Sequence, residues 1–363
     1  MCAMKSVIVI ALAMSGCATV PLATPPPQIG LWAKTSAPTF KGKQDDLHFV
    51  DADHGVYVNG KGQVFRTSNG GTDWEFVLEK PGTFWRTTGF LDEQTGFLGN
   101  LGTDYFPNVT DPVPLYRTDD GGRTVTAVDT GGPAVKGLCA IDVTRLKVVN
   151  SGVLEERVMV HAAGRVGGPS WLLRSLDAGR TWQTIDLNSQ LAMITDVKYF
   201  SESIGFVVGA SNADVEQSHA VILRTDDGGK NWRRVYESPR TFEMVWKVSF
   251  PTPEVGFATV MHYDPKRSEQ VVAKTTDGGQ TWVELPMVTN AEAREFGVGF
   301  ITPQMGWVGT AVGGFQTLDG GQTWSPVSFG THVNKIRLVP TGSGGFVGYA
   351  IGKEVYTLRA RAR

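Results

Sequence analysis

Short apolar segments alternate with glycine-rich polar turns along most of the chain. One example is "HAVILRT" at 219–225, where a run of aliphatic residues stands between polar neighbours. Segments of this length, bounded by glycine and small polar residues, are typical of β-strands. The composition agrees, because 44 of the 363 residues are glycine, 10% are aromatic and 41% are hydrophobic. The pattern therefore predicts an all-β chain with many strands and enough apolar residues for a large core.

The polar turns repeat one motif, in which an Asn or Asp at the third position is followed by a glycine-rich pair. The six copies are "TSNGGTDW" (67–74), "TDDGGRTV" (118–125), "SLDAGRTW" (175–182), "TDDGGKNW" (225–232), "TTDGGQTW" (275–282) and "TLDGGQTW" (317–324). Their third positions lie 42 to 57 residues apart, which fits a four-stranded propeller blade. Six copies exclude a single special site.

A second repeat lies out of step with the first and places an aromatic residue five or six positions before a glycine. Its copies are "FVDADHGV" (49–56), "FLDEQTGF" (90–97), "FSESIGF" (200–206), "FPTPEVGF" (250–257) and "FITPQMGW" (300–307). A first strand would end at the Phe and a second would begin at the Gly. A third strand would then lead into the acidic turn, and a fourth would follow it. Together the repeats predict blades of four antiparallel strands.

The first motif resembles the Asp-box, or BNR repeat, of sialidase-like β-propellers. Its physical role is local, because an Asp or Asn oxygen can accept the backbone N–H groups of the turn while glycine supplies positive φ. We therefore expect a structural role, not catalysis, for Asn69, Asp120, Asp177, Asp227, Asp277 and Asp319. In the second copy Val125 replaces Trp, which predicts weaker packing of that blade.

The ends of the chain predict seven blades. Residues 333–359 repeat the first three strands of a blade and then stop without a box, whereas residues 29–37 could supply the missing fourth strand. Pairing the two ends in one blade would close the ring without free strand edges. The six boxes leave six blades as the alternative. The predicted propeller domain covers residues 29–359, followed by a basic tail at 360–363.

The N-terminus resembles a bacterial lipoprotein signal. Residues 1–16 place a lysine before a short apolar stretch, and Met14 to Cys17 resemble a lipobox, although Met replaces the usual Leu. We expect lipidation at Cys17 and a proline-rich tether over residues 17–28. Ala18 resembles outer-membrane sorting, which predicts a periplasmic, lipid-anchored envelope protein. The inner membrane and a start at Met4 stay open.

Charge and cysteine content limit the function classes. The 34 basic and 36 acidic residues are mixed along the chain, so no nucleic-acid surface is expected. The cysteines, Cys2, Cys17 and Cys139, cannot form a disulfide framework or a thiolate metal site. The six histidines show no ligand spacing, and no catalytic motif is present. We therefore expect no cofactor, no metal and no catalytic residue, and a monomer.

Loop lengths point to one face of the disc. The boxes must lie on the side opposite the connections between second and third strands, and three of those connections carry insertions, at 99–114, 209–220 and 261–270. Blade 3 is irregular there, at 162–171. Long loops on a rigid scaffold commonly carry binding residues. The candidates for binding a protein or acidic ligand are Trp85, Arg86, Arg240, Trp246, Lys247, Arg294, His332 and Lys335. Packing of the two tryptophans and solvent exposure of the charges are the alternatives.

Two functions follow from the resemblance. The sialidase Arg-Ile-Pro motif is absent, and residues 45–66 contain only Arg66 as an arginine. The chain is similar overall to lipoprotein propellers of the photosystem II assembly and stability factor type, which implies a membrane-tethered scaffold that binds a partner protein. The alternative is a glycoside hydrolase or a sugar-binding propeller, which as an enzyme would need two facing carboxylates. Candidates for these are Asp104, Asp111, Asp214, Glu216, Asp264 and Glu295.

Overall fold

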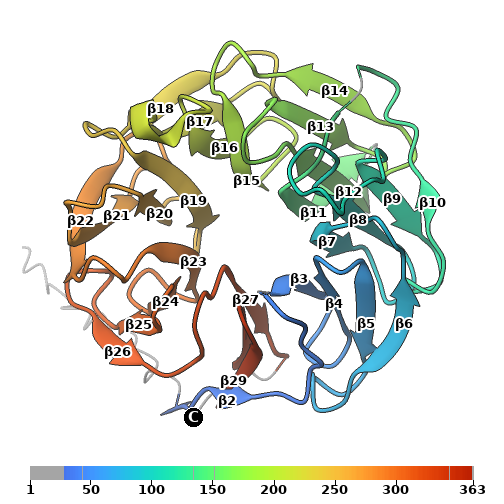
Figure 1. Ribbon diagram of the computed structural model, residues 1–363. Helices are drawn as coiled ribbons and strands as arrows, with labels where there is room; N and C mark the ends of the chain where they lie inside the picture. The colour runs from blue at the N-terminus through green and yellow to red at the C-terminus, as the bar shows by residue number, and fades with distance from the viewer. Residues whose placement is uncertain (1–27, 43, 134, 151, 343, 362–363) are drawn as a thin grey trace, which may run out of the picture.

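Seven four-stranded antiparallel blades form a closed ring around a central axis (Figure 1). This computed structural model describes residues 28–42, 44–133, 135–150, 152–342 and 344–361. Cys17 and the predicted signal and tether up to residue 27 lie outside the described residues. No helix among the described residues is long and apolar enough to cross a membrane. The all-β, seven-bladed prediction is confirmed, and the six-bladed alternative is wrong.

The first four blades follow one another along the chain, each running from its innermost to its outermost strand. Blade 1 comprises β3 (Gln44–Phe49), β4 (Gly55–Asn59), β5 (Gln63–Thr67) and β6 (Glu75–Glu79). Blade 2 comprises β7 (Trp85–Phe90), β8 (Gly96–Asn100), β9 (Leu115–Thr118) and β10 (Thr126–Ala127). Blade 3 comprises β11 (Ala140–Asn150), β12 (Val153–Ala163), β13 (Trp171–Ser175) and β14 (Gln183–Asp186). Blade 4 comprises β15 (Met193–Tyr199), β16 (Gly205–Ala210), β17 (Ala220–Thr225) and β18 (Arg233–Glu237), with the single turn η1 (Val215–Gln217) before β17.

The remaining three blades complete the ring. Blade 5 comprises β19 (Glu243–Ser249), β20 (Gly256–His262), β21 (Glu269–Thr275) and β22 (Val283–Thr289). Blade 6 comprises β23 (Glu295–Phe300), β24 (Gly306–Thr310), β25 (Gly314–Thr317) and β26 (Ser325–Val327). Blade 7 comprises β27 (Lys335–Pro340), β28 (Phe346–Ile351) and β29 (Val355–Arg361), with β1 (Gln28–Ile29) and β2 (Ala33–Lys34) at its edge.

The two chain ends meet in blade 7, as the sequence predicts. Ile29 in β1 pairs with Ala360, and Ala33 in β2 pairs with Thr357, so the N-terminal segment forms the outer strand. Strand β29 continues to Arg361 and pairs there with Gln28. The sheet therefore extends one residue before and two residues beyond the predicted 29–359 domain, because each end supplies backbone partners for the other.

Side-chain packing explains the second repeat, in which an aromatic residue precedes a glycine by five or six positions. The aromatic residue that ends the inner strand lies directly across from the glycine that begins the next strand, as Phe300 does from Gly306. A Cβ atom on Gly306 would lie 2.3 Å from the Phe300 ring, so only glycine leaves room for it. The same ring then stacks on Phe257 of blade 5 at 3.5 Å between centroids. In blade 4 the ring is that of Tyr199, not the predicted Phe200.

Each acidic box is a side-chain-bonded turn. In the fifth box Thr275 Oγ1 donates to Asp277 Oδ1 at 2.8 Å and accepts from Gly279 N at 2.9 Å. The Asp277 carboxylate also accepts from the backbone N of Thr281 at 3.0 Å and from its Oγ1 at 2.6 Å. Asn69 accepts the equivalent backbone bond in the first box through its amide oxygen, at 2.9 Å. These bonds fix the direction in which the fourth strand leaves the turn.

The basic residue just before a box joins neighbouring blades. Arg174 Nη1 donates to the carbonyl of Gly228 in the next box at 2.7 Å, and Lys274 Nζ donates to that of Gly320 at 2.8 Å. In blades 2, 4 and 5 the cation also lies over the Phe that begins the neighbouring strand, for example Lys274 over Phe257 at 5.2 Å. The turn motif and the Gly-Phe motif are therefore parts of one blade-to-blade contact.

Candidate functional site

The two faces of the disc are formed by different loops of the blades. The first box glycine in each boxed blade except blade 3 donates its N–H to the loop between the first two strands, as Gly228 N does to Ser203 O at 2.8 Å. Both kinds of turn therefore lie on one face, which we call the Asp-box face. The loops between second and third strands and the connections between blades lie on the other, which we call the loop face.

A pocket of about 190 Å³, which we call the mouth pocket, opens on the loop face near the inner strands of the ring. Its walls come from the starts of inner strands, from the β8–β9 insertion and from loops of blades 3 and 5. Most of its lining is aromatic or aliphatic. The lining residues are Asp45, Phe84, Arg86, Leu101, Tyr105, Phe106, Val166, Trp246, Tyr263 and Phe296.

The rim of this mouth pocket is formed by two aromatic residues of the β8–β9 insertion. Tyr105 is 43% exposed and Phe106 is 38% exposed. Phe106 stacks on Phe84 at 5.2 Å between centroids, and Tyr105 contacts Phe106 edge-on at 4.9 Å. The buried Arg165 fastens the insertion by donating to Thr103 O at 2.6 Å and to Leu101 O at 3.3 Å. The aromatic rim is thus held on an anchored loop.

The polar part of the mouth pocket is a buried ion pair. Arg86 Nη1 lies 2.6 Å from Asp45 Oδ1, and both side chains are almost completely buried. The Arg86 guanidinium also lies over the Trp246 ring at 5.3 Å. A guanidinium held between a carboxylate and an aromatic face is oriented for a fixed set of hydrogen bonds. The pocket therefore combines apolar walls with one oriented polar group.

Four of the sequence-predicted binding residues come together here. Arg86 and Trp246 line the mouth pocket. Arg294 lies over the ring of the lining residue Tyr263 at 4.3 Å, and His332 stacks on the lining residue Phe296 at 6.2 Å. These side chains come from blades 2, 5 and 6 and from the connection into blade 7, so only the closed ring brings them together.

The other four predicted binding residues are not among those that line the mouth pocket. Trp85 is completely buried, and its Nε1 donates to Gly62 O at 2.9 Å, so the packing alternative applies to it. Lys247 and Lys335 are buried at the inner strands, where Lys247 Nζ lies 3.6 Å from Asp196 Oδ1 and 5.3 Å from the centre of the Trp246 ring. Arg240 is partly exposed and pairs with Glu243 and Glu284, each at 2.8 Å. Their charges serve internal ion pairs, which a residue-by-residue view of the sequence could not distinguish from a surface.

Tyr105, Phe106 and Arg165 are residues that the sequence analysis did not single out. The first two lie inside the insertion 99–114, whose length was the signal for this site. No single-residue signal marks Arg165, because its bonds to the insertion reach backbone carbonyls 62 residues or more away in the chain, beside a local bond to Gly168 O at 2.9 Å.

Five of the carboxylates considered for glycoside hydrolysis, Asp104, Asp111, Asp214, Glu216 and Asp264, are not among the described residues that line the mouth pocket, and the side chain of the sixth, Glu295, lies outside the described part of the structure. Asp111 accepts from Lys80 at 2.8 Å and from Tyr116 at 2.7 Å, which gives it a structural role. Asp214 caps η1, and Asp264 caps the turn at Lys266. Asp104 lies 3.6 Å from Lys136. The carboxylate that does line the pocket, Asp45, is already paired with Arg86.

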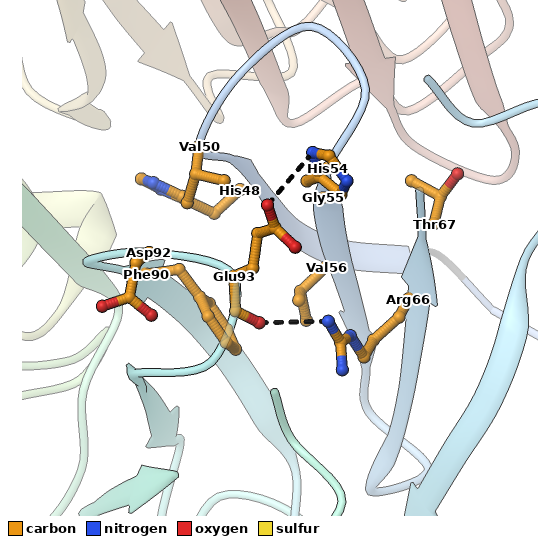
Figure 2. A pocket seen from close by; sticks show the side chains of 10 residues that line it. All are labelled: His48, Val50, His54, Gly55, Val56, Arg66, Thr67, Phe90, Asp92 and Glu93. Carbon is orange, nitrogen blue, oxygen red and sulfur yellow. Dashed lines mark hydrogen bonds and ion pairs between the residues drawn. The ribbon is translucent and has the colours of Figure 1, made fainter. Parts of the chain in front are cut away.

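A much smaller hollow lies on the Asp-box face between blades 1 and 2 (Figure 2). Asp51, His54 and Glu93 approach within 4.8 Å of one another beside it. Asp51 Oδ1 accepts the His54 backbone N–H at 2.7 Å, so it fastens a turn, and its bond to the ring raises the pKa of His54. Figure 2 also shows Arg66 donating to the Glu93 carbonyl, at 3.1 Å. At about 10 Å³ the hollow has room for a water molecule and is a junction between blades.

Comparison with known proteins identifies the fold of the chain but no sequence family. No protein-family model and no curated protein sequence matches the chain. A structure of YCF48 bound to a D1 peptide superposes with a TM-score of 0.62 at 18% identity, covering 94% of this chain and 98% of that one. YCF48 from Cyanidioschyzon merolae gives 0.61 at 17% identity, with 92% and 99% covered. An ancestral GH74 enzyme gives 0.60 at 14% identity, with 90% of this chain and 46% of the enzyme covered. In fold, the chain is a seven-bladed propeller like that of the photosystem II assembly factor.

Proposed function

We propose that the chain is a non-catalytic scaffold that binds a segment of a partner protein in the mouth pocket of the loop face. The observation that carries this proposal is the pocket itself, with exposed Tyr105 and Phe106 at its rim and the Arg86–Asp45 pair inside. Aromatic residues and arginine are the side chains most enriched at the energetic centres of protein interfaces. A pocket of about 190 Å³ is small for a drug-sized ligand and suits one or two side chains.

The comparison with YCF48 supports a peptide as the ligand, since that propeller is known with a D1 peptide bound to it. The pocket chemistry supports it independently. Apolar walls would bury a side chain of the partner, while Arg86 and the neighbouring Arg294 favour an acidic group or a backbone carbonyl beside it. The partner segment thus combines an apolar anchor with an acidic flank.

The rim aromatics offer a clean test. We expect Tyr105→Ser together with Phe106→Ser to remove a specific protein from pull-downs of solubilised membranes, with little change in the melting temperature. Phe76→Ser is the matched control, because Phe76 is also an exposed aromatic, at 53%, but lies on the outer strand β6. An unchanged partner list for the double variant would overturn the proposal. Arg86 is a poor choice for this test, since its removal leaves Asp45 buried without its ion-pair partner.

Anchoring belongs to the same proposal. The lipobox resemblance supports an acylated Cys17 and a place on the periplasmic side of the cell envelope, with the outer membrane favoured. Mass spectrometry of the N-terminal peptide tests this directly. A mature chain that begins elsewhere, or a Cys17 without acyl groups, would contradict it.

A sugar-active role is the second candidate, supported by the likeness to an ancestral GH74 enzyme in fold. Hydrolysis by the common mechanisms needs two carboxyl groups across the scissile bond. The mouth pocket provides Asp45, which is paired with Arg86, so sugar binding fits the pocket better than sugar hydrolysis. Release of reducing sugars from a panel of polysaccharides and sialosides would establish the enzyme; its absence together with a captured protein partner favours the scaffold.

A further inference from the structure

Blade 3 carries a hairpin that is longer than its counterparts. Strands β11 and β12 each have 11 residues, whereas the first two strands of the other blades have five to seven. The box of blade 3 is joined to this hairpin at Val158, whose carbonyl accepts from Ala178 N at 2.9 Å. The pairs from Arg145–Val158 to Asn150–Val153 lie beyond that level. We call residues 145–150 and 152–158 the arm.

The arm projects from the Asp-box face as two strands alone. Strand β13 pairs with β12 only over Val160–Ala163, so no third strand covers the arm. At about 3.4 Å per residue, its six pairs extend about 17 Å past the box. Two-stranded hairpins are only marginally stable by themselves, so an arm of this length needs support at its base.

The base of the arm has that support from both neighbouring blades. Arg145 donates to the Leu91 carbonyl of blade 2, and Arg157 pairs with Glu202 of blade 4. Leu146 packs against the apolar cluster that contains Tyr199 of blade 4. The arm is therefore fixed in direction and carries its tip away from the disc.

Two apolar side chains at the outer end of the arm are exposed, between the polar turn and the exposed Glu155 and Glu156. Val153 is 59% exposed and Leu154 is 63% exposed, next to the partly exposed Val148 on the facing strand. The cation Lys147 is exposed just behind this end. At the corresponding turns of five other blades a polar side chain closes the loop by accepting a backbone N–H; these residues are Asp51, Asp92, Ser201, Thr252 and Thr302. The turn of the arm is polar too, since it runs through Asn150 and Gly152, but two exposed apolar side chains, Val153 and Leu154, follow it directly.

The described chain begins on the same face. Gln28 pairs with Arg361 at the end of β29, where the other third strands enter their boxes. Arg359 reaches the blade 1 box, because a Cβ on Gly70 would lie 2.2 Å from its guanidinium. A lipid at Cys17 would be joined to Gln28 by a segment that spans at most about 36 Å. If the tether of the proposed function is present, it therefore holds the Asp-box face near the membrane.

We infer that the apolar end of the arm inserts into the interfacial layer of a lipid bilayer. The arm and the tether then contact the membrane from one face, so the mouth pocket on the opposite face points away from it. Valine and leucine side chains provide the buried apolar area, while the exposed Lys147, Glu155 and Glu156 stay in the polar headgroup layer. A single lipid chain binds membranes reversibly, and a second contact of this kind makes the attachment more durable and sets its orientation.

Vesicle binding tests this inference without the lipid. The chain from residue 17 onward, with Cys17→Ser, is mixed with vesicles of phosphatidylethanolamine and phosphatidylglycerol and sedimented. We expect Val153→Ser with Leu154→Ser to lower the partition coefficient about ten- to hundredfold, as expected for two apolar side chains leaving an apolar environment. Val312→Ser is the control, an equally apolar and 43% exposed residue on the loop face, and should leave binding unchanged.

A fluorescent probe gives a second readout, which detects contact with the membrane directly instead of a loss of vesicle binding. In the same Cys17→Ser background, Leu154→Cys offers one exposed thiol, because Cys139 is buried. An environment-sensitive dye attached there should shift to shorter wavelength when vesicles are added. Equal sedimentation of all variants together with an unshifted dye overturns the inference.

The remaining outcomes separate this inference from the proposed function. Loss of the captured partner protein from the Val153/Leu154 variant in detergent would make the arm a protein-docking surface and overturn membrane insertion. Conversion of a dimer to a monomer by the same variant would assign the arm to a second copy and overturn it too. An unacylated Cys17 would refute the tether alone, since the vesicle assays contain no acyl chain.

Discussion

Six blades of this propeller are fastened by a local motif, and the seventh by contacts between the two ends of the chain. In blades 1 to 6 each box closes its own turn within eight residues, as Thr275 to Trp282 do in blade 5. Blade 7 has no box. Its junction with blade 1 lies between the innermost strands of the two blades. There Lys335 and Arg337 both bond to the fully buried Asp46, and Asn334 donates to Asp45 O at 2.7 Å.

The comparison shows how one ring uses two kinds of chemistry. A box forms between residues close in sequence, so little loop entropy is lost when its bonds form. The closing contacts join residues 289 or more positions apart and can form only when the ring is nearly complete. Burial alone would raise the pKa of Asp46, but the charges of Lys335 and Arg337 lower it well below its usual range. The junction therefore depends on complete pairing of buried charges.

The largest effect is expected from breaking the closing junction. Asp46→Ala leaves two cations without their carboxylate and removes the bonds from Thr87 Oγ1 and Thr88 N, at 2.9 and 3.0 Å, that link blade 2. We expect the free energy of unfolding to fall by about 3 to 5 kcal/mol, as for other buried pairs that lose one partner. Urea unfolding followed by circular dichroism measures it. A loss below about 1 kcal/mol would show that strand pairing closes the ring alone.

A single box should matter less. Asp277→Ala removes acceptors for two backbone N–H groups, those of Gln280 and Thr281, on an exposed turn. We expect a loss of about 1 to 2 kcal/mol, the scale of a helix cap, with no change in partner capture on the opposite face. Lost capture at an unchanged melting temperature would contradict the structural role of the box.

The same box predicts an acid response. Bonds from the Oγ1 and N of Thr281 lower the pKa of Asp277 to about 2. Because the folded state binds its proton less readily than the unfolded chain, the stabilisation is complete above pH about 4 and is lost as the pH falls towards 2. The difference in stability between the wild type and Asp277→Asn should therefore shrink between pH 5 and pH 2.5. A difference that stays constant over this range would assign the effect to shape instead of charge.

The smallest effect concerns the box that departs from the pattern. Ala178 has a φ of 60° at the place where the other boxes have glycine. The left-handed conformation costs alanine about 1 kcal/mol, partly offset by the freedom that glycine loses on folding. We expect Ala178→Gly to stabilise by less than about 1 kcal/mol, measured by the shift in melting temperature. A clear destabilisation would show that the packing of its methyl group in blade 3 outweighs the strain.

The sequence predicted best where the chemistry is local and repeated. The blade spacing, the Gly-Phe pairs and the unboxed last repeat were sufficient for seven blades and for their closure by both chain ends. The replacement of Trp by Val125 likewise coincides with the two-residue outer strand β10. The candidate site was harder to predict. The insertion that carries Tyr105 and Phe106 was found by its length, but Lys335 belongs to the closing junction, and Trp85 to the core.

The sequence by itself determined the repeating unit, because a box or a Gly-Phe pair is completed by neighbours a few residues away. The tertiary structure alone decided which charges line the mouth pocket. Arg86 and Lys335 look alike in the sequence, yet Arg86 reaches a pocket with aromatic walls, and Lys335 meets Asp46 from the other end of the chain. The arm of blade 3 was also visible only in the structure, where the exposed Val153 and Leu154 lie at the end of a hairpin longer than its counterparts. These features depend on segments far apart in the chain, which only the closed ring brings together.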